Sequence, residues 1–249
     1  ENFGTDPSDI SVSFNGTPAE FELVDESTIV ATTPADYKTG NVTVTIHGYT
    51  MTGSAMFNPN SKGDVTVLYL QNYKQPFAKA NDENWKNGEW WTPAVWNQNA
   101  ASFNAKGNTT VSGMQYKSEE GLTLAFQNGW DKEAYTNGKM WQVATLRPGK
   151  YRLEVTYAYT LVVTDAGNFI SVLIAKGDSE SDIPNVADLE QLNGVYVVYD
   201  KMGTANDSGT LVTPSFEVTE TTDVVIGFLT SLAKGNSYFK VTELKLILE

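Results

Sequence analysis

The amino-acid sequence predicts an all-β protein built from β-sandwiches, and three observations support this prediction. Short runs of alternating or β-branched residues recur along the chain between Gly, Asn, Asp and Pro turns. No segment combines helical periodicity with helix caps over the length of a long amphipathic helix. A stretch of turn formers without apolar residues, 58–63, divides two strand-rich regions. We therefore expect two β-sandwich domains, 1–60 and 64–249.

The expected strands follow one another along the whole chain. They cover residues 10–14, 28–32, 41–47, 65–70, 122–126, 151–159, 169–174, 195–199, 215–218, 224–229 and 238–248. One helical turn is expected after Pro184, over 186–192, where a loop is the alternative. All six tryptophans follow the boundary between the domains. This shift in composition indicates that the two domains have different roles.

The composition excludes several chemistries. The 249 residues include no cysteine and a single histidine, so disulfides, cysteine-ligated metals and a histidine-rich metal site are excluded. Thirty acidic and 17 basic residues give a net charge of -13. Such a charge repels a phosphate backbone, so nucleic acid is not an expected partner. No apolar run reaches the ~20 residues that span a bilayer, so no transmembrane segment is expected in this chain.

The first domain has the pattern of a small antiparallel sandwich, in which alternating residues from Ile10 run into an Asn15-Gly16 turn. The domain resembles the immunoglobulin-like TIG (IPT) family in four runs, which are Glu-Asn-Phe-Gly at 1–4, Val-Ser-Phe-Asn-Gly at 12–16, Ala-Thr-Thr-Pro at 31–34 and Thr-Gly-Asn-Val-Thr-Val at 39–44. That family opens with a strand just before Glu-Asn-Phe-Gly. The resemblance implies an immunoglobulin-like sandwich whose first strand is missing, with the role of a spacer and no site.

Four tryptophans of the second domain, Trp85, Trp90, Trp91 and Trp96, lie within twelve residues. Asn, Gly, Glu, Lys and Pro separate them, which indicates a loop. Flat aromatic rings on a loop, with polar neighbours such as Asn97, would form a stacking surface for sugar rings. Core packing is the alternative, because tryptophans are usually highly buried. Adjacent Trp90 and Trp91 would also point to opposite faces of an extended chain.

A second group of loop aromatics, Trp130 and Tyr135, also lies among polar residues, and we expect it to line the ligand site. Trp141 differs, because it alternates with Met140 and Gln142 on a strand, and core packing is expected for it. The candidate ligand-binding residues are Trp85, Trp90, Trp91, Trp96, Asn97, Trp130 and Tyr135.

The second domain also carries a family resemblance. Its signals are an Asn-Gly-Lys-Met-Trp-Gln strand at 137–142, a Leu-Arg-Pro-Gly-Lys-Tyr turn at 146–151 and the closing strand 238–246. Residues 64–249 are similar to the galactose-binding-like jelly rolls of bacterial surface glycan-utilisation lipoproteins and carbohydrate-binding modules. The resemblance implies a β-jelly-roll sandwich that binds a poly- or oligosaccharide. It also implies an extracellular or outer-surface location, with a lipid anchor in the full-length protein.

Catalysis and metal binding have weaker sequence support. A glycosidase needs two facing carboxylates, and the candidates are Glu89, Asp131, Glu133 and Asp165. Asp178, Glu180 and Asp182 alternate as at the start of an EF-hand loop, but Ile183 and Leu189 stand where Gly and Glu are required. We interpret this stretch as a solvated acidic loop. No cofactor is expected, although the jelly-roll resemblance leaves a structural calcium ion open.

The sequence thus predicts non-catalytic glycan binding by aromatic stacking and hydrogen bonds, and the acidic balance favours neutral or basic sugars. The alternatives are a structural or adhesion module that binds another surface protein and, third, a glycoside hydrolase. Other cell-surface glycan-utilisation proteins are further candidate partners. Exposed, roughly coplanar tryptophan rings would favour a glycan, whereas buried rings would favour a structural role.

Overall fold

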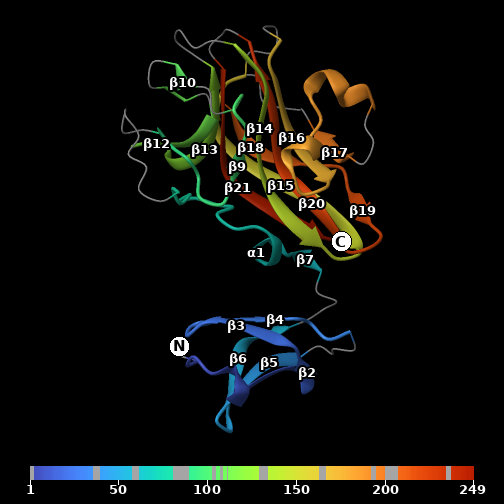
Figure 1. Cartoon of the computed structure of the whole chain (residues 1–249). Coiled ribbons are helices and arrows are strands. Elements are labelled where there is room, and N and C mark those ends of the chain that lie inside the picture. Colours follow the sequence, from blue (N-terminus) through green and yellow to red (C-terminus); the bar gives the residue numbers. More distant parts are fainter. Residues whose placement is uncertain are drawn as a thin grey trace. The chain divides into compact units, whose positions relative to one another are not determined.

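The computed structural model describes residues 3–35, 40–57, 62–80, 90–102, 105–106, 109–110, 112–128, 134–162, 167–191, 195–199, 207–233 and 237–249. The chain divides into two compact units, Glu1–Ser61 and Lys62–Glu249 (Figure 1). This division falls within the stretch of turn formers, 58–63, that the sequence shows. Both units are built from β-sheets, which confirms the all-β prediction.

The smaller unit is an antiparallel sandwich. Its four-stranded sheet has the order β2 (Thr17–Ala19), β1 (Ile10–Phe14), β5 (Gly40–Ile46) and β6 (Tyr49–Phe57). The second sheet pairs β3 (Phe21–Asp25) with β4 (Thr28–Ala31). Alternate residues of β1 are buried, namely Ile10, Val12 and Phe14. The apolar residues at every second position of β1 therefore form part of this unit's core.

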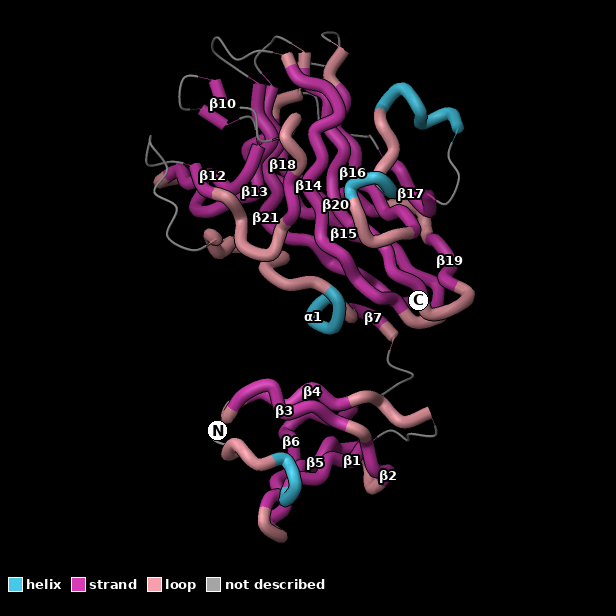
Figure 2. Tube along the Cα trace, in the orientation of Figure 1, coloured by secondary structure: helices cyan, strands magenta, loops and turns pink. Residues whose placement is uncertain are grey.

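The larger unit contains two large antiparallel sheets (Figure 2). The eight-stranded sheet has the order β18 (Asp207–Val212), β15 (Gly149–Thr160), β21 (Ser237–Leu248), β13 (Gly121–Asn128), β12 (Ser112–Lys117) and β8 (Trp90–Trp91), with β19 (Phe216–Val218) on β15 and β7 (Gly63–Asp64) on β21. The five-stranded sheet has the order β17 (Val195–Tyr199), β16 (Phe169–Lys176), β20 (Thr222–Leu232), β14 (Tyr135–Leu146) and β9 (Asn97–Gln98). A small hairpin joins β10 (Ala105–Lys106) to β11 (Thr109–Thr110).

One hydrophobic core lies between the inner faces of these two sheets. Leu124 and Phe126 of β13 and Leu153 of β15 reach it from one sheet, while Met140 of β14 and Phe228 of β20 reach it from the other. Each residue alternates with one on the opposite face, as expected for a two-layer sandwich. The side chains on the opposite face of each sheet therefore point away from this core and are able to contact other groups.

The segment expected as a strand at 65–70 forms a helical turn instead, α1 (Thr66–Tyr69). The Asp64 carboxylate accepts hydrogen bonds from the backbone N–H of Thr66, at 3.0 Å, and from its hydroxyl group. These bonds satisfy the donors of Thr66, whose backbone N–H would need a neighbouring strand as partner if the segment were extended. The helical turn begins at this residue. Val67 and Leu68 consequently point to solvent. The strand prediction failed because it weighed β-branched residues and overlooked the hydrogen bonds that Asp64 accepts from Thr66, two residues further on.

A segment with two short 3-10 helices, η3 (Glu180–Asp182) and η4 (Val186–Gln191), packs on the outer face of the five-stranded sheet. Its Ile183 joins Trp141 and Leu173 in a second hydrophobic cluster. Trp141 is therefore a core residue, as its alternation predicts. The helical turn expected after Pro184 is present as η4.

Candidate functional site

The tryptophans of β8 do not form a common surface. Trp90 and Trp91 pair with Gln115 and Met114 of β12, respectively. Trp90 is only 2% exposed. Trp91 is half-buried and packs against the main core cluster. Because neighbouring side chains of a strand point to opposite faces, the two rings cannot stack on one sugar chain together.

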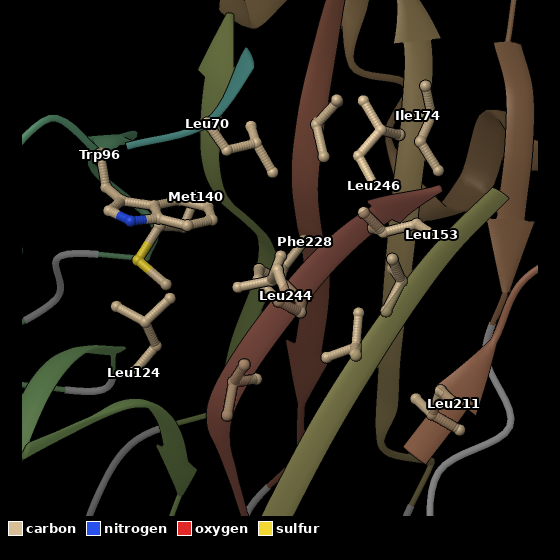
Figure 3. Packing of buried hydrophobic residues seen from close by; sticks show 14 of the residues in the cluster. Leu70, Trp96, Leu124, Met140, Leu153, Ile174, Leu211, Phe228, Leu244 and Leu246 are labelled. Atoms are coloured by element: carbon tan, nitrogen blue, oxygen red, sulfur yellow. The ribbon is translucent and has the colours of Figure 1, made fainter. Parts of the chain in front are cut away.

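Trp96 lies within the core (Figure 3). Its indole is 5% exposed, lies beside Met140, and has its centroid 6.1 Å from that of the Phe228 ring. The indole N–H donates a hydrogen bond of 3.0 Å to the backbone carbonyl of Asn72. An indole enclosed in this way offers no ring face to a ligand.

Tyr135 is also enclosed. Its hydroxyl group hydrogen-bonds to the Thr230 hydroxyl at 3.0 Å, and burial raises the pKa of the Tyr135 phenol. The rings of Trp90, Trp96 and Tyr135 are buried, so they do not form the exposed stacking surface that the sequence analysis expects of them. Asn97 is exposed on β9, and it remains a prediction together with Trp91. Trp85 and Trp130 lie outside the described residues.

An accessible aromatic surface is found elsewhere, on the outer face of the eight-stranded sheet. A hollow of about 370 Å³ is lined there by Glu120, Ala158, Tyr159, Ser208 and Tyr238. Tyr159 is 46% exposed and Tyr238 is half-buried. We call this feature the tyrosine hollow. Its lining comes from β15, β18, β21 and the turn between β12 and β13.

A β-bulge brings Tyr159 into the hollow. Burial along β15 alternates up to Tyr157, which faces the core. The pairing with β18 then slips by one residue between Tyr157 and Thr160, so Thr160 is buried and Tyr159 turns outward. The Tyr159 backbone has a φ of 52°, in the left-handed region, and its hydroxyl donates a 3.1 Å hydrogen bond to the carbonyl of Glu119. Re-aiming a side chain in this way is a common role of bulges.

Strand β21 supplies the second ring by simple alternation. Phe239 and Val241 point into the core, so Tyr238 and Lys240 lie on the outer face. The Lys240 ammonium lies 5.4 Å from the centroid of the Tyr238 ring, within the range of a cation–π interaction. The same ammonium forms an ion pair with the Glu120 carboxylate. Lys240 therefore connects the ring and the carboxylate of the hollow.

The turn between β12 and β13 holds Glu120 in place. Its backbone N–H donates to the carbonyl of Lys117 at 3.1 Å, and its own carbonyl accepts a 2.8 Å hydrogen bond from the Gln75 side chain. Gly121 follows with a φ of 73°, a conformation that glycine adopts without strain. The turn is thus fixed at both the backbone and the side chain, and it presents Glu120 to the hollow.

This combination of groups suits an uncharged, hydroxyl-rich ligand. Tyrosine rings offer apolar faces with polar tips, and the Glu120 carboxylate accepts hydrogen bonds from hydroxyl groups. Glu120 is the one carboxylate among the described residues of the lining, whereas glycoside hydrolysis uses two. The four carboxylates considered for hydrolysis, Glu89, Asp131, Glu133 and Asp165, lie outside the described residues.

The acidic loop 178–182 uses its carboxylates as hydrogen-bond acceptors for the protein itself. Asp182 accepts from the Ser179 hydroxyl at 2.6 Å and from the N–H groups of Ser179 and Asp178, which lowers the pKa of its carboxyl group. Glu180 accepts a 3.1 Å hydrogen bond from the Asn99 amide. Across the part of the chain that the structure describes, no group of three or more acidic or histidine side chains could hold a metal ion.

Comparisons with known proteins identify two sequence families. The model of the family described as domain of unknown function (DUF5013) matches residues 71–227, and that of the IPT/TIG domain matches residues 1–62. Among curated proteins, none matches the chain. In the described residues, no helix is long and apolar enough to cross a membrane.

The solved structures to which the chain is similar share little sequence with it. The module TmCBM61 in complex with β-1,4-galactotriose has a TM-score of 0.37 and 11% identity, over 68% of this chain and 97% of that one. The CBM22-1 xylan-binding domain of Paenibacillus barcinonensis Xyn10C has a TM-score of 0.35 and 9% identity, over 63% of this chain and 87% of that one. The K1 adhesin domain of Lys-gingipain from Porphyromonas gingivalis has a TM-score of 0.35 and 9% identity, over 62% of this chain and 90% of that one. Similarities at this level do not identify a ligand.

Proposed function

The chain belongs to the DUF5013 family and carries an N-terminal TIG domain, and we propose that its larger unit binds a glycan, without catalysis, in the tyrosine hollow. The observation that carries this proposal is the presence of two accessible tyrosine rings, Tyr159 and Tyr238, beside the Glu120 carboxylate. A sugar ring offers C–H groups to the aromatic faces and hydroxyl groups to the carboxylate.

The size and shape of the hollow support a short stretch of a glycan chain as the ligand. Its volume of about 370 Å³ lies at the small end of the ~300–1,000 Å³ that small-molecule sites occupy. The lining is held by the hydrogen bond from the Gln75 side chain to the Glu120 carbonyl and by the ion pair between Glu120 and Lys240. A preformed surface of this kind loses little conformational entropy when a ligand binds.

The proposed setting is the bacterial cell surface or the secreted fraction, with a lipid anchor in the full-length protein. This is the setting of the glycan-utilisation lipoproteins that the larger unit resembles. Other surface proteins of such systems are proposed as neighbours in function. The TIG domain would serve as a spacer that carries the binding unit.

A structural or adhesion module is the second candidate, and the burial of the tryptophans favours it. Trp90 and Trp96 are buried, so two of the four tryptophans between residues 85 and 96 offer no ring face to a ligand. The tyrosine hollow supports glycan binding over this candidate, because a purely structural module has no need for two accessible rings beside a carboxylate.

A glycan array tests the proposal. The unmodified chain would be compared with Tyr159→Ala, Tyr238→Ala and the control Tyr116→Ala, whose ring is 44% exposed but does not line the hollow. We expect binding to one class of neutral glycan, lost in the first two variants and kept in the control. Far-UV circular dichroism would verify that each variant is folded.

Two results would contradict glycan binding in the hollow. One is the absence of binding across the array by the folded chain, which would favour the adhesion module. The other is binding that tolerates both Tyr159→Ala and Tyr238→Ala, which would place the site elsewhere on the molecule.

A further inference from the structure

The ion pair beside the tyrosine hollow is asymmetric in its exposure. The Lys240 side chain is 5% exposed, whereas the Glu120 side chain is 17% exposed. Only the carboxylate lines the hollow, while the ammonium is enclosed with the Tyr238 ring beside it. A ligand that enters the hollow therefore meets the negative partner of the pair first.

From this arrangement we infer that the Glu120–Lys240 pair is a charge filter, which admits neutral glycans and rejects those that contain uronic acids. The inference rests on the proposed function and names the ligand class of the same site. The net charge of the chain alone would also disfavour acidic glycans, whereas the charge filter assigns this selectivity to one carboxylate, that of Glu120.

The physical basis is the cost of placing two like charges together. A uronate carboxylate in the hollow would lie near Glu120 in a partly desolvated setting, where charge repulsion is stronger than in bulk water. Glu119 is exposed on the same turn and adds to the negative potential. A neutral sugar instead donates its hydroxyl hydrogens to the Glu120 carboxylate. The expected preference for the neutral ligand is on the order of tenfold or more.

The enclosed lysine gives this filter a testable property. If the charge of Glu120 is removed, the Lys240 ammonium beneath the hollow loses this counter-charge. A uronate could then take over the role of the Glu120 carboxylate as a counter-charge for this ammonium. The variant Glu120→Gln should therefore bind uronates better than the unmodified chain does. Its preference for neutral glycans over uronates should fall or reverse.

The experiment is calorimetric titration of the full chain with matched ligand pairs. Cellohexaose, β-1,4-mannohexaose and β-1,4-galactohexaose would each be compared with the same chain after oxidation of its C6 hydroxymethyl groups to carboxylates. The variants are Glu120→Gln, the double variant Glu120→Gln/Lys240→Met, and the control Glu217→Gln. Glu217 is an exposed carboxylate on β19, which pairs with the other end of β15.

The expected result is a neutral-to-uronate affinity ratio of about tenfold or more in the unmodified chain and the control. Glu120→Gln should lower this ratio about fivefold, for example from about tenfold to about twofold, and the double variant should lose the uronate binding so gained. An unchanged ratio in Glu120→Gln would overturn the charge filter while leaving glycan binding intact. If none of the neutral ligands binds the folded chain, the proposed function itself fails for this ligand class.

Because Glu120→Gln leaves a buried cation without its Glu120 partner, it carries a risk of misfolding. The double variant removes both charges and avoids this problem. Should only the double variant fold, the filter predicts that its neutral-to-uronate ratio falls below that of the unmodified chain. An equal ratio in the two proteins would overturn the inference.

Discussion

Tyr159 keeps its exposed ring through a backbone conformation that costs free energy. Its φ of 52° lies in the left-handed region, which costs a residue other than glycine ~1–2 kcal/mol. The bulge between β15 and β18 and the hydrogen bond to the Glu119 carbonyl impose this conformation. Strained residues of this kind concentrate at binding sites, where the surrounding structure holds them. The strain at Tyr159 is therefore consistent with a role in binding.

Stability and binding should respond differently to aromatic substitutions. Trp96→Ala is expected to lower the free energy of unfolding by about 3–5 kcal/mol, because it empties a core site. Tyr159→Ala is expected to change it by less than about 1 kcal/mol, since half of the side chain is already in water. Urea denaturation monitored by fluorescence measures both values. A Trp96→Ala variant as stable as the unmodified chain would show that this ring is not part of the core.

The sequence contains a signal for one ring of the hollow but not for the other. Tyr238 and Lys240 alternate with Phe239 and Val241, so their common outer face could be predicted. Tyr159 has the same parity as the buried Tyr157 and reads as a core residue, because the bulge that turns it outward leaves no clear mark in the sequence. The tryptophans misled for a related reason, since residue type alone does not determine exposure.

At the scale of elements, β14 and β20 approach closely beside the indole of Trp141. Gly227 of β20 is opposite Trp141 in the register. A Cβ atom at Gly227 would lie 2.1 Å from the Met140 carbonyl oxygen and 2.7 Å from the Trp141 Cα. Both neighbours are backbone atoms, which move only if the strands separate. Gly227 is therefore required for this pairing.

Gly227→Ala should separate the two central strands of the five-stranded sheet. We expect a loss of about 3 kcal/mol or more in the free energy of unfolding, as in other cases of severe overpacking. Gly209→Ala is the control, because the nearest atom there is the hydroxyl oxygen of Tyr157, at 3.1 Å, at the end of a side chain. Equal melting temperatures for the two variants would contradict the close approach of β14 and β20.

The last residue of the chain connects β21 to its neighbours. Glu249 accepts hydrogen bonds from Lys150 at 3.1 Å, Ser215 at 2.9 Å and Arg152 at 3.1 Å. These bonds, with that from Lys150 the strongest, lower the pKa of the Glu249 carboxyl group to about 2. A carboxylate with a lowered pKa in the folded state stabilises the fold above its unfolded pKa and loses this contribution as the pH falls.

The stability of the larger unit should therefore decrease between pH 4.5 and 2, the interval between the ordinary and the folded pKa of Glu249. Glu249→Gln should reduce this pH dependence, because the amide does not titrate. Melting temperatures from pH 7 to pH 2 would test this, with Glu217→Gln as the control. A variant that follows the profile of the unmodified chain would show that Glu249 does not contribute.

Alternation predicted the long strands well, because β15 and β21 place every second residue in a core that needs them. It failed at 65–70, where the Asp64 side chain competes with strand pairing by accepting hydrogen bonds from the N–H and hydroxyl groups of Thr66. The two-residue strand β8 also escaped prediction, since its pairing is set by tertiary contacts and not by a local pattern.

At the scale of the whole molecule, each compact unit has its own core. The main hydrophobic cluster is formed by residues from Val65 to Leu248, all in the larger unit, while Ile10, Val12 and Phe14 are buried in the smaller one. The tyrosine hollow is lined by residues of the larger unit. Folding and binding of the larger unit should therefore not require the TIG domain.

Residues 62–249 expressed alone should fold and bind the same glycan with a dissociation constant within about twofold of that of the full chain. The two dissociation constants should agree because the core and the hollow both lie within this unit. Calorimetric titration of both proteins with the glycan found on the array provides the comparison. A loss of tenfold or more in affinity, in a fragment that is folded, would assign a binding role to the TIG domain.

A crystal structure of the chain with its glycan bound tests the central claim most directly. We predict a sugar ring stacked on Tyr159 or Tyr238, with at least one of its hydroxyl groups within hydrogen-bond distance of the Glu120 carboxylate. A glycan bound away from these three residues, with the tyrosine hollow unchanged, would contradict the account.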